Sequence, residues 1–121
     1  MEGGSIAVER MDNGVAVVTL RGEHDLATAG ELRRELAELV EQDRAVVVDL
    51  EATAFIDSTI LGVILGGLRR AREAGHPFAL VLDDETAPNI GKLFQLTGLR
   101  LIFSVYPTRD AALDAVTSPP V

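Results

Sequence analysis

The chain has 121 residues, of which 47% are hydrophobic and 25% are charged, as is typical of one globular domain. Its formal net charge of −8 at pH 7 argues against nucleic acids and anionic membranes as partners. The lack of cysteine excludes disulfides and thiolate chemistry, and two histidines are too few for a histidine-rich metal site. Neither a secretion signal nor a membrane-spanning run is present. We therefore expect a cytoplasmic protein without a metal or cofactor.

The first two predicted strands form a hairpin. Residues 6–10 alternate weakly between apolar and polar, and residues 15–21 are apolar and rich in β-branched side chains. Between them, Asn13-Gly14 is a strong signal for a tight turn. The polar residues 22–25 that follow are expected to form a solvated loop.

An amphipathic helix is predicted next. Thr28 and Glu31 have the spacing of a capping box, in which each side chain satisfies a free backbone N–H at the helix start. The apolar residues that follow recur at helical spacing and form one stripe: Leu32, Leu36, Leu39 and Val40.

Strands and helices alternate along the rest of the chain. Residues 45–50 form an apolar run typical of a strand that is covered on both faces, and residues 51–56 are expected to be a connection. A helix over residues 58–74 ends at Gly75. The remaining predicted elements are a strand at 78–82, a helix at 86–97, a strand at 101–105, a helix at 108–116 and a flexible tail at 117–121.

This order of elements, β-β-α-β-α-β-α-β-α, predicts a single α/β domain over residues 1–116. Hydrophobic strands that alternate with helices imply parallel pairing through right-handed crossovers. The opening hairpin adds an antiparallel pair, so the predicted sheet is mixed.

The segment Phe55-Ile56-Asp57-Ser58-Thr59 places polar residues directly before an apolar helix. Asp57 or Ser58 is suited to be its N-cap, because either side-chain oxygen can accept from the first-turn N–H groups. The helix contains three glycines, each about 1 kcal/mol less favourable than alanine. We expect two of them, Gly62 and Gly66, to allow close approach to the sheet or to a partner.

In this frame of elements, the chain resembles a STAS domain of the bacterial anti-sigma factor antagonist branch. The resemblance covers residues 6–116. It is carried by Gly22, Asp25, Val47-Val48-Asp49-Leu50, Phe55-Ile56-Asp57-Ser58-Thr59, Leu61-Gly62 and Leu96-Thr97-Gly98-Leu99.

The resemblance implies a protein-binding switch and not an enzyme. An antagonist of this family binds an anti-sigma factor that is also a serine kinase, and the sigma factor is released. The kinase then phosphorylates the serine that follows the aspartate, here Ser58, the complex dissociates, and a serine phosphatase resets the system. The implied partner-binding surface around Ser58 consists of Glu23, Asp25, Asp57, Thr59 and Gly62. We expect a monomer or weak dimer that binds neither nucleic acid nor membrane.

The switch has a physical rationale. A phosphate adds about −1.5 to −2 charges, which the N-terminus of a helix tolerates because its free N–H groups favour anions. All of the excess negative charge of the chain lies in residues 1–60, which suits a partner with a basic patch. Many members of the family have glycine at the position of Ile60, and a branched residue there is expected to alter the first helical turn.

Three other functions are weighed. A non-switching STAS scaffold in a transporter or signalling complex would bind a large partner without any dependence on phosphate. An enzyme with Ser58 or Asp57 as nucleophile would need His24 as its base. A receiver-like phospho-aspartate domain would need an acidic pair after its first strand, which the sequence lacks.

Overall fold

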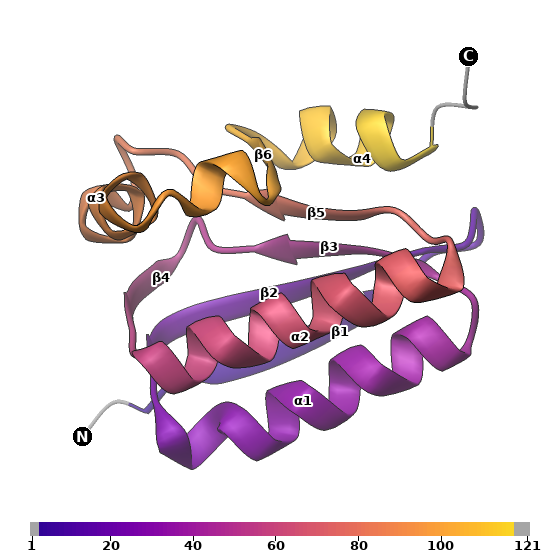
Figure 1. Ribbon diagram of the computed structural model, residues 1–121, viewed down its shortest axis with the longest axis horizontal. Coiled ribbons are helices and arrows are strands. Elements are labelled where there is room, and N and C mark those ends of the chain that lie inside the picture. Colours follow the sequence, from indigo (N-terminus) through magenta and orange to yellow (C-terminus); the bar gives the residue numbers. More distant parts are fainter. Residues whose placement is uncertain (1–2, 118–121) are drawn as a thin grey trace.

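A computed structural model describes residues 3–117, which form a sheet with helices on both faces (Figure 1). The elements in chain order are β1 (Ser5–Arg10), β2 (Val15–His24), α1 (Leu26–Glu41), β3 (Ala45–Asp49), β4 (Thr53–Ile56), α2 (Ser58–Ala74), β5 (Phe78–Val81), α3 (Pro88–Thr97), the 3₁₀ helix η1 (Leu99–Leu101), β6 (Ser104–Tyr106) and α4 (Arg109–Thr117). Thr117 thus ends α4, and the rest of the predicted tail, 118–121, lies outside the described residues.

The sheet is mixed, and the predicted α/β class is confirmed. Its strand order is β1-β2-β3-β5-β6, and β4 pairs with β2 beside this path. The hairpin β1–β2 is antiparallel, whereas the other strand pairs are parallel. The ten-residue β2 pairs with β3 as far as Thr19 and with β4 from Gly22 onward. Its end therefore lies beside β4, which diverges from β3 in Figure 1.

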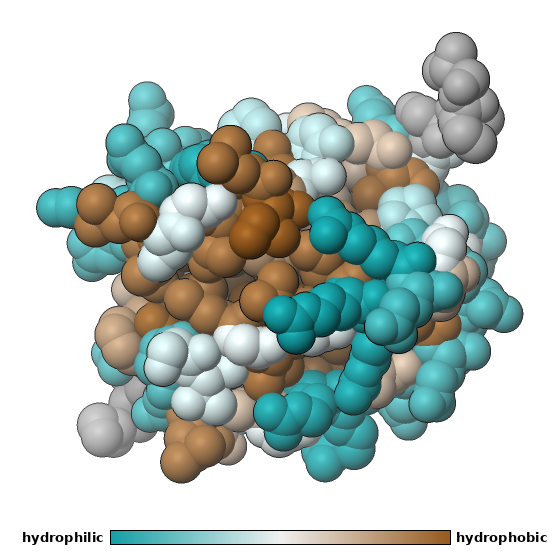
Figure 2. Space-filling model, viewed as in Figure 1, coloured by the Kyte–Doolittle hydropathy of each residue, from teal (hydrophilic) through white to brown (hydrophobic). Residues whose placement is uncertain are grey.

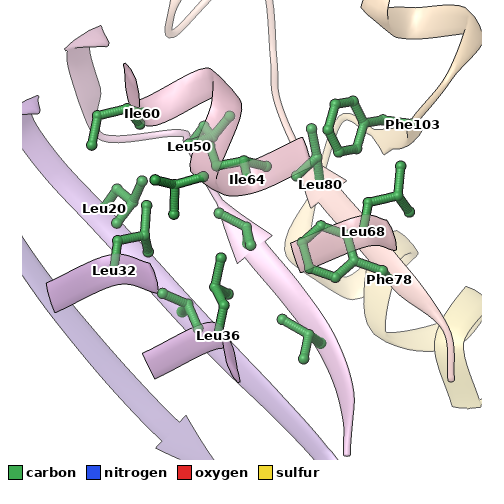
Figure 3. Packing of buried hydrophobic residues seen from close by; sticks show 14 of the residues in the cluster. Leu20, Leu32, Leu36, Leu50, Ile60, Ile64, Leu68, Phe78, Leu80 and Phe103 are labelled. Carbon is green, nitrogen blue, oxygen red and sulfur yellow. The ribbon is translucent and has the colours of Figure 1, made fainter. Parts of the chain in front are cut away.

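Both faces of the sheet are covered, which explains the continuous apolar run in β3. Val46 and Val48 belong to the larger core cluster, which lies under α1, α2 and α3, and Val47 belongs to the smaller cluster under α4. Figure 3 shows side chains from α1 and α2 meeting those of the sheet in the larger cluster. Within residues 3–117, no helix is long and apolar enough to cross a membrane.

Two expectations about the strands are wrong. The predicted connection at residues 51–56 contains β4, in which the Thr53 hydroxyl donates to the carbonyl of Leu20 at 2.7 Å; a short strand of mixed polarity gives little periodic signal. The strand predicted at residues 101–105 is displaced to β6, because Gly98 at φ 72° ends α3 and η1 follows directly.

The close approach to the sheet predicted at Gly62 and Gly66 is also wrong, whereas the alternative of a close approach to a partner stays a prediction. A Cβ at either position would meet nothing within 4 Å. The close approach occurs instead at Gly67, where a Cβ would lie 3.0 Å from Leu36 Cδ1 and 3.1 Å from the Phe78 ring. This glycine lets α2 pack against α1 and β5, which offsets its poor helix propensity.

An ion pair between half-buried Arg109 and buried Asp49 attaches α4 to the sheet. Asp49 is buried at the end of β3, and its Oδ2 accepts from Arg109 Nε at 3.0 Å and Nη2 at 2.8 Å. Arg109 Nη2 also donates to the hydroxyl of Thr19 at 3.0 Å. Nearby, burial and the charge of Asp49 raise the pKa of Glu51, with a smaller contribution from Asp83 and an opposing one from Arg109.

The raised pKa of Glu51 predicts that its ionised form destabilises the fold. Because the folded state binds this proton more tightly than the unfolded state does, stability falls as pH rises from about 4.5 through the folded pKa. We expect Glu51→Gln to raise the free energy of unfolding at pH 7 and to have little effect at pH 4, measured by urea denaturation. The exposed Glu85→Gln is the control, and a Glu51→Gln protein no more stable than wild type at pH 7 would contradict the prediction.

Candidate functional site

The helices α1 and α2 begin side by side at one end of the sheet (Figure 1). Each follows one of two paired parallel strands, because His24 at the end of β2 is in register with Ile56 at the end of β4. The N–H of Asp57 donates to the carbonyl of His24 at 3.3 Å, which joins the two junctions directly. Asp25 and Asp57 therefore occupy equivalent places before the two helices.

The loop predicted at residues 22–25 is wrong, because β2 continues through His24. An irregularity in the pairing lies between Gly22 and Glu23, and Gly22 has a φ of 80°, which favours glycine. The N–H of Gly22 donates to the carbonyl of Ala52 at 3.0 Å. The strand continues because β4 supplies a new partner where β3 ends.

His24 is a buried structural residue and not part of a solvated loop. Its side chain is 0% exposed. Nδ1 lies 2.9 Å from the hydroxyl of Thr28. Nε2 lies 3.1 Å from the carbonyl of Arg21, which only accepts, so Nε2 donates. Both ring nitrogens are thus engaged, and within residues 3–117 no hydrogen bond joins His24 to Ser58. The pairing of His24 with Ser58 that the enzyme alternative would use is therefore not formed among the described residues.

Asp25, and not the predicted Thr28, is the N-cap of α1. Its side chain accepts from the N–H of Ala27 at 2.9 Å, and the helix begins at Leu26. Thr28 lies inside the first turn and its hydroxyl contacts His24. The predicted capping box with Glu31 is therefore wrong, since the aspartate directly after the strand takes the capping position.

Asp57 is the N-cap of α2, which leaves the side chain of Ser58 free of any capping role. Asp57 Oδ1 accepts from the N–H of Ile60 at 2.9 Å. Ser58 is the first helical residue, its side chain is exposed, and within residues 3–117 no hydrogen bond holds its hydroxyl. The sequence left the cap open between these two residues, and the structure assigns it to Asp57.

The first turn of α2 is regular, so the alteration expected from Ile60 is not observed. The side chain of Ile60 is fully buried beneath the helix start (Figure 3). The N–H of Leu61 donates to the carbonyl of Asp57 at 3.1 Å, as in an ordinary first turn. The branched side chain thus faces the core and not the solvent.

The remaining predicted site residues differ in exposure. Glu23 and Asp25 are exposed, whereas Asp57 and Thr59 are half-buried. Gly62 is exposed and lies four residues along α2 from Ser58, on the same side of the helix.

Two apolar side chains, whose exposure the sequence did not predict, lie beside these carboxylates. Leu26 is 74% exposed directly after Asp25, and Phe55 is 50% exposed in register with Glu23. Large apolar side chains are usually interpreted from sequence as core, so no pattern predicted that these two are exposed. We call this region the Ser58 surface; it consists of Glu23, Asp25, Leu26, Phe55, Asp57 and Ser58.

A cavity of about 300 Å³ adjoins the Ser58 surface between β4 and α3. It is mainly apolar and is lined by Ala54, Phe55, Ile56, Asn89, Ile90 and Leu93. Within residues 3–117, no group of three or more histidine or carboxylate side chains could hold a metal ion. The site therefore offers carboxylates, apolar contacts and the free hydroxyl of Ser58.

Comparison with known proteins gives a consistent result. Residues 7–112 match the model of the STAS domain. The anti-sigma F factor antagonist of Paenibacillus polymyxa is 30% identical over 106 residues, which cover 86% of each chain. The crystal structure of an anti-sigma factor antagonist from Mycobacterium paratuberculosis has a TM-score of 0.81 at 32% identity and covers 96% of each chain. The Bacillus cell fate determinant SpoIIAA in its phosphorylated form shares the fold, with a TM-score of 0.72 at 24% identity over 93% of this chain and 99% of that one.

The cap of α2 predicts the effect of replacing Asp57. Asp57→Ala removes the acceptor for the N–H of Ile60 and should lower the free energy of unfolding by about 1 kcal/mol, measured by urea denaturation. Asp57→Asn keeps a capping oxygen and should stay close to wild type. An alanine variant as stable as the asparagine variant would show that another group caps the helix.

The contact of buried His24 with Thr28 gives a second prediction. Thr28→Val keeps the shape of the side chain but leaves Nδ1 of His24 without its partner. The free energy of unfolding should therefore fall by about 1–3 kcal/mol. Thr28→Ser retains the hydroxyl and is the matched control. Equal thermal midpoints for the two variants would mean that this hydrogen bond contributes nothing.

Proposed function

The chain belongs to the STAS domain family, and on that premise we propose that it is an anti-sigma factor antagonist. It binds an anti-sigma factor serine kinase, which releases the sigma factor, and phosphorylation of Ser58 ends the binding. The observation that carries the proposal is the exposed hydroxyl of Ser58, free of hydrogen bonds within the described residues, at the start of α2. The antagonists at about 30% identity support the same function.

The phosphoryl transfer needs only an accessible hydroxyl from this chain. Ser58 Oγ attacks the γ-phosphorus of ATP held by the kinase, and the new Oγ–P bond forms as the bond to the β–γ bridging oxygen breaks. ADP leaves, and the proton of the hydroxyl passes to a base of the kinase. The proposed role of this chain is therefore that of substrate and binding partner, not of catalyst.

The fold should tolerate the added phosphate. Asp57 uses its carboxylate to bind the N–H of Ile60, so no structural bond is lost when Ser58 Oγ is esterified. The N–H groups of Ser58 and Thr59 in the first turn remain free within residues 3–117, and the positive end of the helix dipole stabilises an anion there by about 0.3–1 kcal/mol. SpoIIAA, which has the same fold, exists in a phosphorylated form.

The interface should not tolerate it. The carboxylates of Glu23, Asp25 and Asp57 add negative charge near Ser58, so the phosphate makes this part of the interface still more negative. The hydroxyl must also reach the nucleotide of the kinase, so the new dianion faces the phosphates of ADP. Like charges at short range cost several kcal/mol, which separates the partners. A serine phosphatase that hydrolyses the ester restores binding.

The test of this proposal is phosphorylation followed by binding. After incubation with the cognate kinase and ATP, mass spectrometry should find one phosphate, on Ser58. Ser58→Ala should bind the kinase without being modified, and Ser58→Asp should bind at least about tenfold more weakly. Thr59→Ala is the matched control and should be modified like wild type.

Two results would contradict the proposal. One is an unmodified Ser58 together with wild-type affinity of the Ser58→Asp variant. The other is a stable complex with a large partner whose affinity does not change with phosphate, which would favour the scaffold function instead.

A further inference from the structure

A small cavity between α1 and α2 is bordered by two arginines. Its volume is about 50 Å³, and Arg33 of α1 and Arg70 of α2 line it together with the exposed Gly62. Leu36 lies against Gly67 and fixes how the two helices pack. Figure 2 shows strongly hydrophilic side chains over the middle of the two helices and paler ones over the start of α2. The proposed switch gives neither arginine a role.

Arg33 is a cation without a partner among the described residues. Its side chain is exposed, and within residues 3–117 it makes no hydrogen bond and no ion pair. Residues one turn away along α1 face it, and all of them are uncharged: Ala29, Gly30, Leu36 and Ala37. No carboxylate lines the cavity that Arg33 borders. Its positive charge is therefore not offset on its own side of α1 or in the cavity.

The direction of the helices brings the side chain of Arg33 toward Ser58. Both helices begin side by side at the same end of the sheet (Figure 1). Side chains of an α-helix lean toward its N-terminus, so the stem of Arg33 leans toward the end at which α2 begins. Gly62, which borders the same cavity, lies about 6 Å along α2 from Ser58. A Cβ on Gly62 would meet nothing within 4 Å, so the space between Arg33 and Ser58 is open at this point.

A phosphate on Ser58 would be the strongest anion within reach of Arg33. The charged groups of the Ser58 surface are the carboxylates of Glu23, Asp25 and Asp57, and within residues 3–117 none of them pairs with Arg33. The two aspartates already accept from a backbone N–H of their helix. A phosphate adds about −1.5 to −2 charges and three strong acceptor oxygens, which a guanidinium binds bidentately.

We propose that Arg33 is the intramolecular partner of phosphorylated Ser58. After phosphorylation, the guanidinium of Arg33 turns across Gly62 and donates two hydrogen bonds to oxygens of the phosphate. Modification then adds an ion pair to the domain, and the pair holds the phosphate in a fixed position at the start of α2. The inference deepens the proposed function and rests on it, because only a phosphorylated Ser58 supplies the anion.

The test measures the pKa of the phosphate by ³¹P NMR. Phosphoserine is placed at position 58 during synthesis by stop-codon suppression, so the measurement needs no kinase. The second pKa of phosphoserine is ordinarily about 6. In the otherwise wild-type chain it should be about 0.5 lower than in Arg33→Gln, because the guanidinium favours the dianion. Arg33 is exposed, so circular dichroism should show an intact fold.

Arg70→Gln is the matched control, because it removes the other arginine of the same cavity. Arg70 lies about 18 Å along α2 from Ser58, beyond the screening length of about 8 Å at physiological salt. Its replacement should leave the phosphate pKa unchanged. Unfolding midpoints give a second readout: the phosphate should raise the midpoint of the wild-type chain more than that of Arg33→Gln.

The same phosphate pKa in Arg33→Gln and in the wild-type chain overturns the proposal, as does an equal change in Arg70→Gln. Failure of the proposed function gives a different result. A kinase that leaves Ser58 unmodified contradicts the switch, but it does not alter the pKa of a phosphate introduced by synthesis.

Discussion

The parallel pairing of β4 with the end of β2 determines the geometry of the site. Past Thr19, β2 leaves β3 and takes β4 as its partner, so His24 and Ile56 end in register. Each strand is followed at once by an aspartate that caps a helix. Two helix starts therefore meet at one end of the sheet, and their carboxylates and free N–H groups form a single surface. His24 reinforces this arrangement, because its ring binds the first turn of α1 and its carbonyl accepts from Asp57.

The different roles of Asp57, which caps the helix, and Ser58, which has an exposed hydroxyl, follow from this geometry. A serine that capped the helix would lose its structural bond when modified, so modification would destabilise the domain. Because Asp57 makes the capping bond and Ile60 fills the core below, Ser58 contributes only an exposed hydroxyl. In the proposed function, the same position combines tolerance within the fold with sensitivity at the interface, and this combination is what a reversible binding switch requires.

Much of the fold could be predicted from sequence, and the failures have physical causes. The bounds of α2 were predicted correctly because an apolar stripe and Gly75, at φ 77°, mark them clearly. The strand β4 was missed because it is short and has exposed residues at its centre. The cap of α1 was misplaced because Thr28 fits a capping box, whereas the strand ends at His24 and Asp25 already caps the helix. Burial of His24 and exposure of Phe55 depend on tertiary neighbours, which no local pattern contains.

The central claim is that a dianion on Ser58 disrupts a complex without disrupting the domain. The most direct measurement is the thermal unfolding midpoint of the purified domain, phosphorylated on Ser58 and unmodified, at the same pH and salt. An equal or higher midpoint for the phosphorylated form is predicted, because the phosphate lies at a helix N-terminus and breaks no existing bond. A clearly lower midpoint would contradict the account, since loss of binding would then follow from loss of the fold.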